Sequence, residues 1–351
     1  MTQEKDPTQT SSSGRRPTIR EVALAADTSI GTVSRVLNGN SKVAKATKLR
    51  VMDAIRSTGY QLNIAAQMMR TKRSMTIGLL IPDIVSPTFS KIAAGAEAVL
   101  SEEGYLLLVA SANRRVDSEI GFINAAVQRQ MDGLILSLTN EKSTDILDVL
   151  SSLKTPTLIL DRDIPIDCDV IFSEHAETLR QAVEHLTNLG HRRIGYVGAS
   201  QDIRPGRERV RGLKRGLEQA SIELDQNLIR TGQQGPHYGE VETSSLLMLD
   251  NPPTALIAGT GDIFPGALRA IRTMGLKIPD DISIIGVDET SMADLIDPPI
   301  TVVARDMVQF GQAAAQLLLE RIKSPDAIVK RLVLTSELIY RHSTARPPST
   351  R

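Results

Sequence analysis

Apolar runs alternate with amphipathic stretches from Met75 to about residue 288 of this 351-residue chain. Short apolar runs bounded by turn residues are typical of strands buried on both faces, and the stretches between them show helical spacing. Strands that alternate with helices form parallel βαβ units. Two such series follow one another, so we predict an α/β core of two lobes, each a parallel sheet flanked by helices.

The expected elements of each series can be read directly from the sequence. The first series has strand runs TIGLLIP, YLLLVA, GLILSL and PTLIL, with helices at 91–103, 119–129 and 146–153. The second has strand runs RIGYVG, 227–231, TALIAG and ISIIGVD, with helices at 177–189, 206–219, 240–249 and 265–274.

A different pattern precedes this core, between Thr18 and Asn38. One apolar stripe with helical spacing predicts a first helix, and its members are Ile19, Val22, Ala23 and Ala26. A turn at 26–28 follows, where Asp27 tolerates left-handed backbone, and Ser29 is suited to cap a second helix. That helix buries Val33, Val36 and Leu37 and turns Ile30, Gly31, Ser34 and Arg35 outward.

Two helices arranged in this way present the second one to the major groove of DNA, although an ordinary helical hairpin has the same pattern. A third helix is expected from about Lys45 to Thr58, ended by Gly59, with Tyr60 closing a small core. The chain has no net charge, but residues 1–75 hold 13 Lys and Arg against 5 Asp and Glu. A basic head on an acidic body favours contact with a polyanion through the head.

The amino-acid sequence of these segments resembles that of the LacI–GalR family of bacterial transcription regulators. The run T-V-S-R-V-L-N follows I-x-E-V-A in the head. The core contains V-E-H-L-x-x-L-G-H-R-R-I-G-Y-V-G, G-L-K-I-P-D-D-I-S-I-I-G-V-D and D-P-P-I-T-V-V. The resemblance covers about 18–345. One departure is Asp27, where the family usually has Gly.

The resemblance implies that 63–74 is a hinge helix that enters the minor groove when a dimer sits on its operator. Ala66 takes the position of the small groove-facing residue. Met69 stands where the family usually has an intercalating Leu, so the apolar wedge that bends DNA is Met here. A plain linker is the alternative for this segment. The candidate DNA contacts are Thr18, Ser29, Ile30, Gly31, Thr32, Ser34, Arg35, Asn38, Asn63, Ala66 and Met69.

Ligands of open α/β sheets bind beyond the carboxyl ends of the strands. Arg209 aligns with the Arg that family members commonly use to grip an effector, whereas Thr260 departs from the family's usual Asn. The candidate effector contacts are Ser86, Thr88, Asp161, Arg209, Thr260 and Asp288. Acceptors and a guanidinium suit a polyhydroxy ligand. A structural role remains the alternative for both aspartates, and Arg209 could pair with Glu208 or Glu240.

Other classes of protein fit the sequence less well. Five scattered His and the single Cys168 show no metal-ligand spacing, and we expect no metal, cofactor or disulfide. Dinucleotide, P-loop and GxSxG motifs are absent from the sequence, so we expect no enzyme. A periplasmic solute receptor would share the core, but a polar N-terminus without an apolar signal segment, with no transmembrane run, favours a cytoplasmic protein. Trp is absent and aromatic residues are 3%, which limits stacking on a ligand.

The sequence therefore predicts a DNA-binding regulator, a repressor, whose operator affinity depends on a sugar or sugar acid, with a purine as the alternative effector. Its partners are a pseudo-palindromic double-stranded operator, the effector and a second copy in a homodimer. We expect a disordered tail (1–17), a helix-turn-helix domain (18–62), a hinge (63–74), a core (75–343) and a tail (344–351). Lobe 1 takes about 75–174 and 304–335, and lobe 2 takes about 175–303 and 336–343.

Overall fold

The computed structural model describes residues 17–37, 43–60, 73–288 and 291–348 and divides the chain into two compact units, Met1–Arg73 and Ser74–Arg351. The first unit, the head, contains helices α1 (Ile19–Ala25), α2 (Ile30–Leu37) and α3 (Lys45–Thr58). Their apolar faces meet in one small core of Val22, Ala23, Ala26, Val33, Val36, Val51 and Ala54. The head is therefore the three-helix unit that its apolar spacing predicts.

Local chemistry sets the helix ends of the head. Asp27 has φ of 46°, so the turn between α1 and α2 uses left-handed backbone. The Ser29 hydroxyl accepts a hydrogen bond from the Thr32 N–H at 3.1 Å, which satisfies one free donor of α2. Gly59, with φ of 65°, ends α3, and Tyr60 packs against the core.

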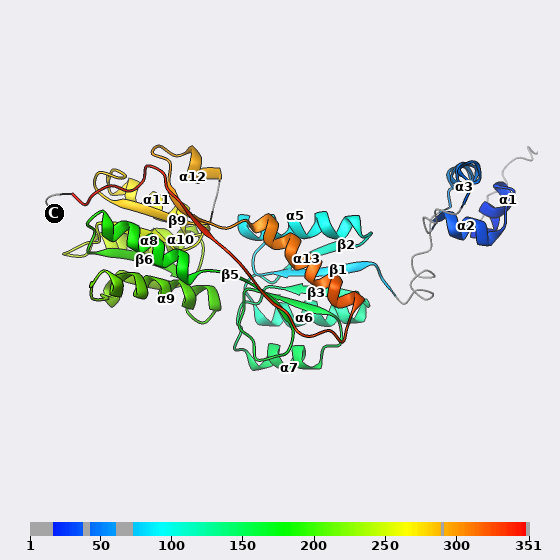
Figure 1. The fold of residues 1–351 in the computed structure, drawn as a ribbon, viewed down its shortest axis with the longest axis horizontal. Helices are drawn as coiled ribbons and strands as arrows, with labels where there is room; N and C mark the ends of the chain where they lie inside the picture. The colour runs from blue at the N-terminus through cyan, green and yellow to red at the C-terminus, as the bar shows by residue number, and fades with distance from the viewer. Residues whose placement is uncertain (1–16, 38–42, 61–72, 289–290, 349–351) are drawn as a thin grey trace, which may run out of the picture. The chain divides into compact units, whose positions relative to one another are not determined.

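Lobe 1 of the second unit is a six-stranded sheet in the order β11-β5-β4-β3-β1-β2, and its paired strands are all parallel. Helices α5 and α13 cover one face, and α6 and α7 cover the other (Figure 1). The strands are β1 (Thr76–Ile81), β2 (Leu106–Ser111), β3 (Gly133–Leu136), β4 (Thr157–Leu160), β5 (Asp169–Ser173) and β11 (Arg331–Leu334). The helices are α5 (Pro87–Glu102), α6 (Val116–Gln128), α7 (Thr144–Ser152) and α13 (Met307–Lys323).

Lobe 2 repeats this plan in the order β12-β10-β9-β8-β6-β7, with only the β10–β12 pair antiparallel. The strands are β6 (Ile194–Ala199), β7 (Ile229–Gly232), β8 (Ala255–Ala258), β9 (Ser283–Val287), β10 (Thr301–Ala304) and β12 (Glu337–Ile339). Helices α8 (Ala176–Asn188) and α9 (Arg204–Gln219) pack on one face. The other face carries α10 (Pro236–Leu247), α11 (Phe264–Thr273) and the short α12 (Ser291–Leu295), and a 3-10 turn, η1 (Gln226–Leu228), precedes β7. The predicted α/β class with two parallel-sheet lobes is confirmed.

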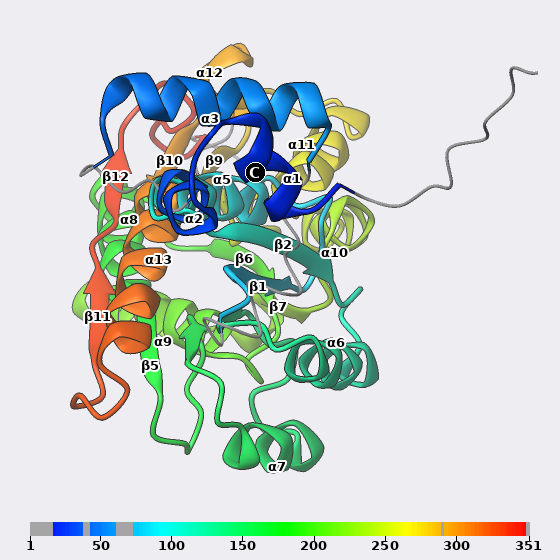
Figure 2. The same ribbon diagram turned by 90° about the vertical axis from the view of Figure 1, so that its right-hand side faces the viewer.

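Three connections join the lobes: β5 to α8, β10 to α13, and β11 to β12. The last one is the red segment that runs from one lobe to the other in Figures 1 and 2. The two sheets meet with their carboxyl ends around these connections, which places the loops after β1, β4, β8 and β9 between the lobes.

Among the described helices, none is long and apolar enough to cross a membrane.

Some elements differ from the sequence expectations. Helices α5 and α10 begin at Pro87 and Pro236, four residues before their predicted starts, because Pro suits the first helical turn. Strands β5, β10, β11 and β12 and helix α13 were not among the predicted runs. The predicted tail from 344 packs on lobe 2: His185 Nε2 lies 2.9 Å from the Thr344 hydroxyl, and His191 Nε2 lies 2.9 Å from the Ala345 carbonyl oxygen.

Candidate functional site

The outward face of α2 carries side chains that its own packing does not use. Ile30 is 44% exposed, and Gly31 and Arg35 are exposed as well. Thr32 and Ser34 are half-buried, and the Thr32 hydroxyl lies 2.9 Å from the Ser29 hydroxyl. An apolar side chain and a guanidinium on one exposed helix face are suited to a thymine methyl group and a guanine edge.

Other candidate DNA contacts of the head have a structural use. The Thr18 N–H and hydroxyl both donate to the Glu21 carboxylate, which closes the start of α1. Ser29 caps α2. Asn38, Asn63, Ala66 and Met69 lie outside the described residues, and so does the predicted hinge apart from residues 73–74.

A cavity lies between the lobes of the core, with about 660 Å³ of atom-free space that is partly open to solvent. All six residues predicted to contact an effector line it: Ser86, Thr88, Asp161, Arg209, Thr260 and Asp288. The rule that ligands meet the carboxyl ends of strands therefore brings together residues that are up to 202 positions apart in the sequence.

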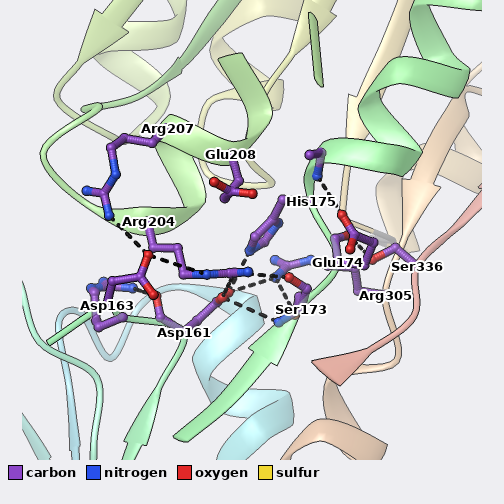
Figure 3. Close-up of polar contacts among 12 residues, drawn as sticks. Asp161, Asp163, Ser173, Glu174, His175, Arg204, Arg207, Glu208, Arg305 and Ser336 are labelled. Carbon is purple, nitrogen blue, oxygen red and sulfur yellow. Dashed lines mark hydrogen bonds and ion pairs between the residues drawn. The ribbon is translucent and has the colours of Figure 1, made fainter. Parts of the chain in front are cut away.

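Asp161 follows β4 with φ of 54° and is the centre of a buried polar cluster (Figure 3). Its Oδ1 accepts from Arg204 at 3.1 Å and from the Ser173 N–H at 3.3 Å. Its Oδ2 lies 2.7 Å from His175 Nε2 and 3.7 Å from an Arg305 nitrogen. Both oxygens of this carboxylate are therefore occupied by groups from the lobe connections and from α9.

The charges of this cluster follow from burial and from the arginines. Burial lowers the pKa of His175 to about 4, against the opposing charge of Asp161, so the imidazole is neutral near pH 7 and donates through Nε2. Burial alone would raise the pKa of Asp161, but His175, Arg305 and Arg204 outweigh it and lower the pKa. Because His175 is neutral, we attribute the ionised carboxylate mainly to the two arginines.

Asp288 is the counterpart of Asp161 in lobe 2. It follows β9 with φ of 75°, and the Arg305 guanidinium donates two hydrogen bonds to its Oδ1, one of them at 2.7 Å. Its Oδ2 accepts from the Thr88 hydroxyl at 3.2 Å and from the Gly261 N–H at 3.4 Å. Burial raises the pKa of this carboxyl, but Arg305 and then Arg209 more than compensate, so its pKa is lowered. Thr88 and Asp288 link the two lobes directly.

Arg209 differs from these groups. It is only 4% exposed, lines the cavity from α9, and makes no hydrogen bond or ion pair to any described residue. Glu208 pairs with Arg211, and Glu240 pairs with Arg269, so neither is its partner. Burial lowers the pKa of the Arg209 guanidinium, with Arg305 acting in the same direction. A buried cation that has no acceptor among the described residues is costly, so Arg209 is the group of the cleft best suited to bind a ligand.

The remaining predicted contacts are partly engaged. The Ser86 side chain acts on Asp262, lowering a pKa that burial raises, and Asp262 also lies 3.5 Å from Arg114, so both interactions join lobe 1 to lobe 2. The Thr260 hydroxyl accepts from the Ile263 N–H at 3.2 Å, which fixes the turn before α11. Phe89 and Phe310 are aromatic residues of the cavity lining, whereas Phe264 belongs to the core of lobe 2 and Tyr238 packs against it.

Several cleft residues escaped sequence reasoning: Arg305, Arg204, His175, Asp262 and Gln234. The strand-end rule would have identified Arg305 and His175, since they follow β10 and β5, but these strands were not predicted. Gln234 follows β7, which was predicted, and its amide was overlooked. The described part of the chain contains no cluster of His, Cys, Asp or Glu that could hold a metal ion.

A helix-turn-helix head followed by a two-lobed core with a polar cleft defines a class of DNA-binding protein with a ligand-binding core. The head matches the model "Bacterial regulatory proteins, lacI family" over residues 18–63, and the core matches the periplasmic binding protein-like domain over 183–344. The Escherichia coli K12 repressor CytR is 30% identical over 333 residues, 94% of this chain and 97% of that protein. The Bacillus subtilis regulator DegA is 29% identical over 94% of this chain and 98% of its own length.

Solved structures give the same result. The lac repressor dimer bound to operator and the anti-inducer ONPF has a TM-score of 0.83 at 26% identity, covering 94% of this chain and all of that one. The complex of the regulator CelR with cellobiose has a TM-score of 0.72 at 28% identity, covering 93% and 100%. The chain belongs to the LacI family of bacterial regulatory proteins, as its sequence motifs predict.

Proposed function

We propose that this protein is a sequence-specific transcriptional repressor whose operator affinity is controlled by a small polyhydroxy effector, a sugar or sugar acid, bound between the lobes. The observation that carries this proposal is Arg209, a buried guanidinium without a partner among the described residues, which faces the cleft. The same chain carries a recognition helix with Ile30 and Arg35 exposed. A ligand sensor and a DNA reader in one chain make a metabolite-controlled regulator.

A homodimer belongs to this proposal, because a single small head makes few base contacts and symmetric dimers read two half-sites. The edge strand β2 supports it: Leu106, Leu108 and Val109 are all at least 40% exposed. Val85, in the loop after β1, is 83% exposed. Apolar side chains on an exposed edge strand are typical of a surface that another chain covers. Sedimentation of the full chain should show a dimer and no stable tetramer.

Segment 63–74 is the covalent link between head and core, and we propose that it transmits the effector signal as a hinge helix, in the cytoplasm where the operator is. An effector changes operator affinity only if it binds one arrangement of the lobes better than another, and couplings of about 1–3 kcal/mol are usual. Met69→Gly should then weaken operator binding through loss of the wedge and of helix propensity, while ligand binding by the core persists.

The test has two stages with the full chain. An operator is first selected from random double-stranded DNA, and a pseudo-palindrome is the expected product. Sugars, sugar acids and purines are then screened for a rise in thermal midpoint, since a ligand of the folded state stabilises it. A ligand that stabilises the chain should also change the operator Kd. Failure to select any DNA sequence would refute the regulator, and a purine as the sole ligand would refute the polyhydroxy effector.

A further inference from the structure

The three aspartates that line the cleft already have partners within the protein. Asp161 is bound by Arg204, Ser173 and His175, and Asp288 is bound by Arg305, Thr88 and Gly261. Asp262 lies 3.5 Å from Arg114 and interacts with the Ser86 side chain. A neutral sugar is held when carboxylates accept its hydroxyl protons. Each carboxylate of the lining is thus already engaged by protein groups and offers fewer free acceptor sites to a neutral sugar.

The balance of charge in the lining points the same way. Arg114, Arg162, Arg209 and Arg305 face Asp161, Asp262 and Asp288, so cations outnumber anions by one. Among the described residues, every arginine of the lining except Arg209 has a partner: Arg305 binds Asp288, Arg114 pairs with Asp262, and Arg162 donates to the carbonyl oxygens of Leu138 and Asp161. The surplus positive charge of the cleft is thus located on Arg209.

A second buried donor, the Tyr196 hydroxyl, lies within the electrostatic range of Arg209. The Tyr196 hydroxyl is fully buried and has no hydrogen-bond partner within the described structure. Burial raises its pKa to about 12, while the charge of Arg209 acts in the opposite direction, so the hydroxyl keeps its proton at neutral pH. The ring fits because Gly198 and Gly259 have no Cβ, and a methyl group at either position would overlap the hydroxyl. A second buried donor therefore lies close enough to feel the charge of Arg209.

We infer that the effector is an anion, a small polyhydroxy molecule whose carboxylate or phosphate group binds the Arg209 guanidinium. This inference rests on the proposed function and narrows its ligand class. An anionic group compensates the buried charge of Arg209 without breaking the aspartate pairs, and its charge-assisted hydrogen bonds are stronger than those of a neutral hydroxyl. Hydroxyl groups of the ligand are left to Ser137, Gln234 and other polar groups of the lining.

The experiment compares matched probes on the full chain at constant ionic strength. The probes are D-glucose, D-gluconate, D-glucuronate, D-glucose 6-phosphate, the same set for D-galactose, and inorganic phosphate, with sodium chloride as the reference. At least one anion should raise the thermal midpoint above the chloride reference, and its neutral parent should not. Stabilisation by the acids alone identifies a carboxylate ligand, and stabilisation by the phosphates alone identifies a phosphate ligand.

Variants locate the effect. Arg209→Gln should weaken binding of the stabilising anion by roughly tenfold to a hundredfold, and Arg209→Lys should recover part of it. Arg211→Gln is the matched control, because Arg211 is an exposed arginine of the same helix that pairs with Glu208, and it should bind the anion as the wild type does.

Three outcomes overturn the inference: a neutral sugar that stabilises as well as its acid or phosphate, an anion effect that survives Arg209→Gln, or no anion above the chloride reference. The operator selection separates this failure from failure of the proposed function. A chain that binds its operator and whose operator affinity changes with a neutral sugar remains a regulator, but its effector belongs to a different ligand class. A chain that selects no operator refutes the function itself.

Discussion

The head and the cleft place their functional side chains in opposite ways. On α2, Ile30, Gly31 and Arg35 stand in solvent, and the core of the head is complete without them. In the cleft, Asp161, Asp288 and Arg305 are buried and bound to one another or to the lobe connections. Candidate DNA-contacting side chains can be solvated in the free protein, whereas buried charges must be paired within the protein before a ligand binds. Substitutions in the head should therefore affect binding, and substitutions in the cleft should affect folding as well.

The largest expected effect comes from removing one charge of the cleft. Asp288→Asn leaves Arg305 buried without its main counter-charge, so the free energy of unfolding should fall by about 3–5 kcal/mol. The matched change in the head is Asp53→Asn, which breaks the exposed Arg56–Asp53 pair and should cost less than about 1 kcal/mol. Denaturant unfolding of the full chain measures both. Equal costs would remove the distinction between the two regions.

Acidification should also act on the cleft before the head. The pKa of His175 is about 4 in the fold against an ordinary 6.5, so the unfolded chain binds the proton first. This contribution to stability is complete above about pH 6.5 and is lost as the pH falls toward 4, by about 3 kcal/mol at most. His175→Gln should flatten the pH dependence of unfolding in that window. The exposed His342→Gln serves as control and should leave the wild-type slope unchanged.

Base reading by the head is the next largest effect. Arg35→Ala should weaken operator binding by about 1–3 kcal/mol and relax the preference at one base pair, if Arg35 contacts a guanine. The free energy of unfolding should hardly change, because Arg35 is exposed. Titration of the selected operator and of single-base variants tests this. Equal weakening on every sequence would assign Arg35 to phosphate, and full specificity in an Ile30→Ala, Arg35→Ala double mutant would remove α2 as the reader.

The smallest effect concerns Gly31. A Cβ at this position would lie 3.7 Å from the Ser29 hydroxyl and 3.8 Å from an Arg35 nitrogen, which are ordinary contacts. Gly31→Ala should thus stabilise α2 by up to about 1 kcal/mol, seen as slower hydrogen exchange of its amides in the full chain. If the wall of the DNA major groove contacts Gly31, the added methyl group should also lower the affinity for the operator. Unchanged affinity would show that Gly31 does not contact DNA.

Much of the fold followed from short-range patterns. The stripe in α1, the Ser29 cap and the end of α3 at Gly59 depend on residues within one or two helical turns, so the sequence suffices for them. Strands β5 and β10 were not predicted because they lie directly before the connections between the lobes, outside the two series of alternating strands and helices. Strand β12 is only three residues long and pairs antiparallel, which hides it further.

Motifs and strand ends are local properties, so the family, the α/β class and the six candidate cleft positions could be predicted without a structure. Which of those side chains remain available to a ligand depends on contacts that form only in the folded core. Asp161 is bound by the neutral His175, 14 residues away, and its charge is balanced by Arg204, 43 residues away. The charge of Asp288 is balanced by Arg305, which lies beyond a further strand. Such pairs form when separate sheets bring their carboxyl ends together, so no local sequence pattern predicts them. For the same reason, only the folded core shows that Arg209 is buried and has no partner among the described residues.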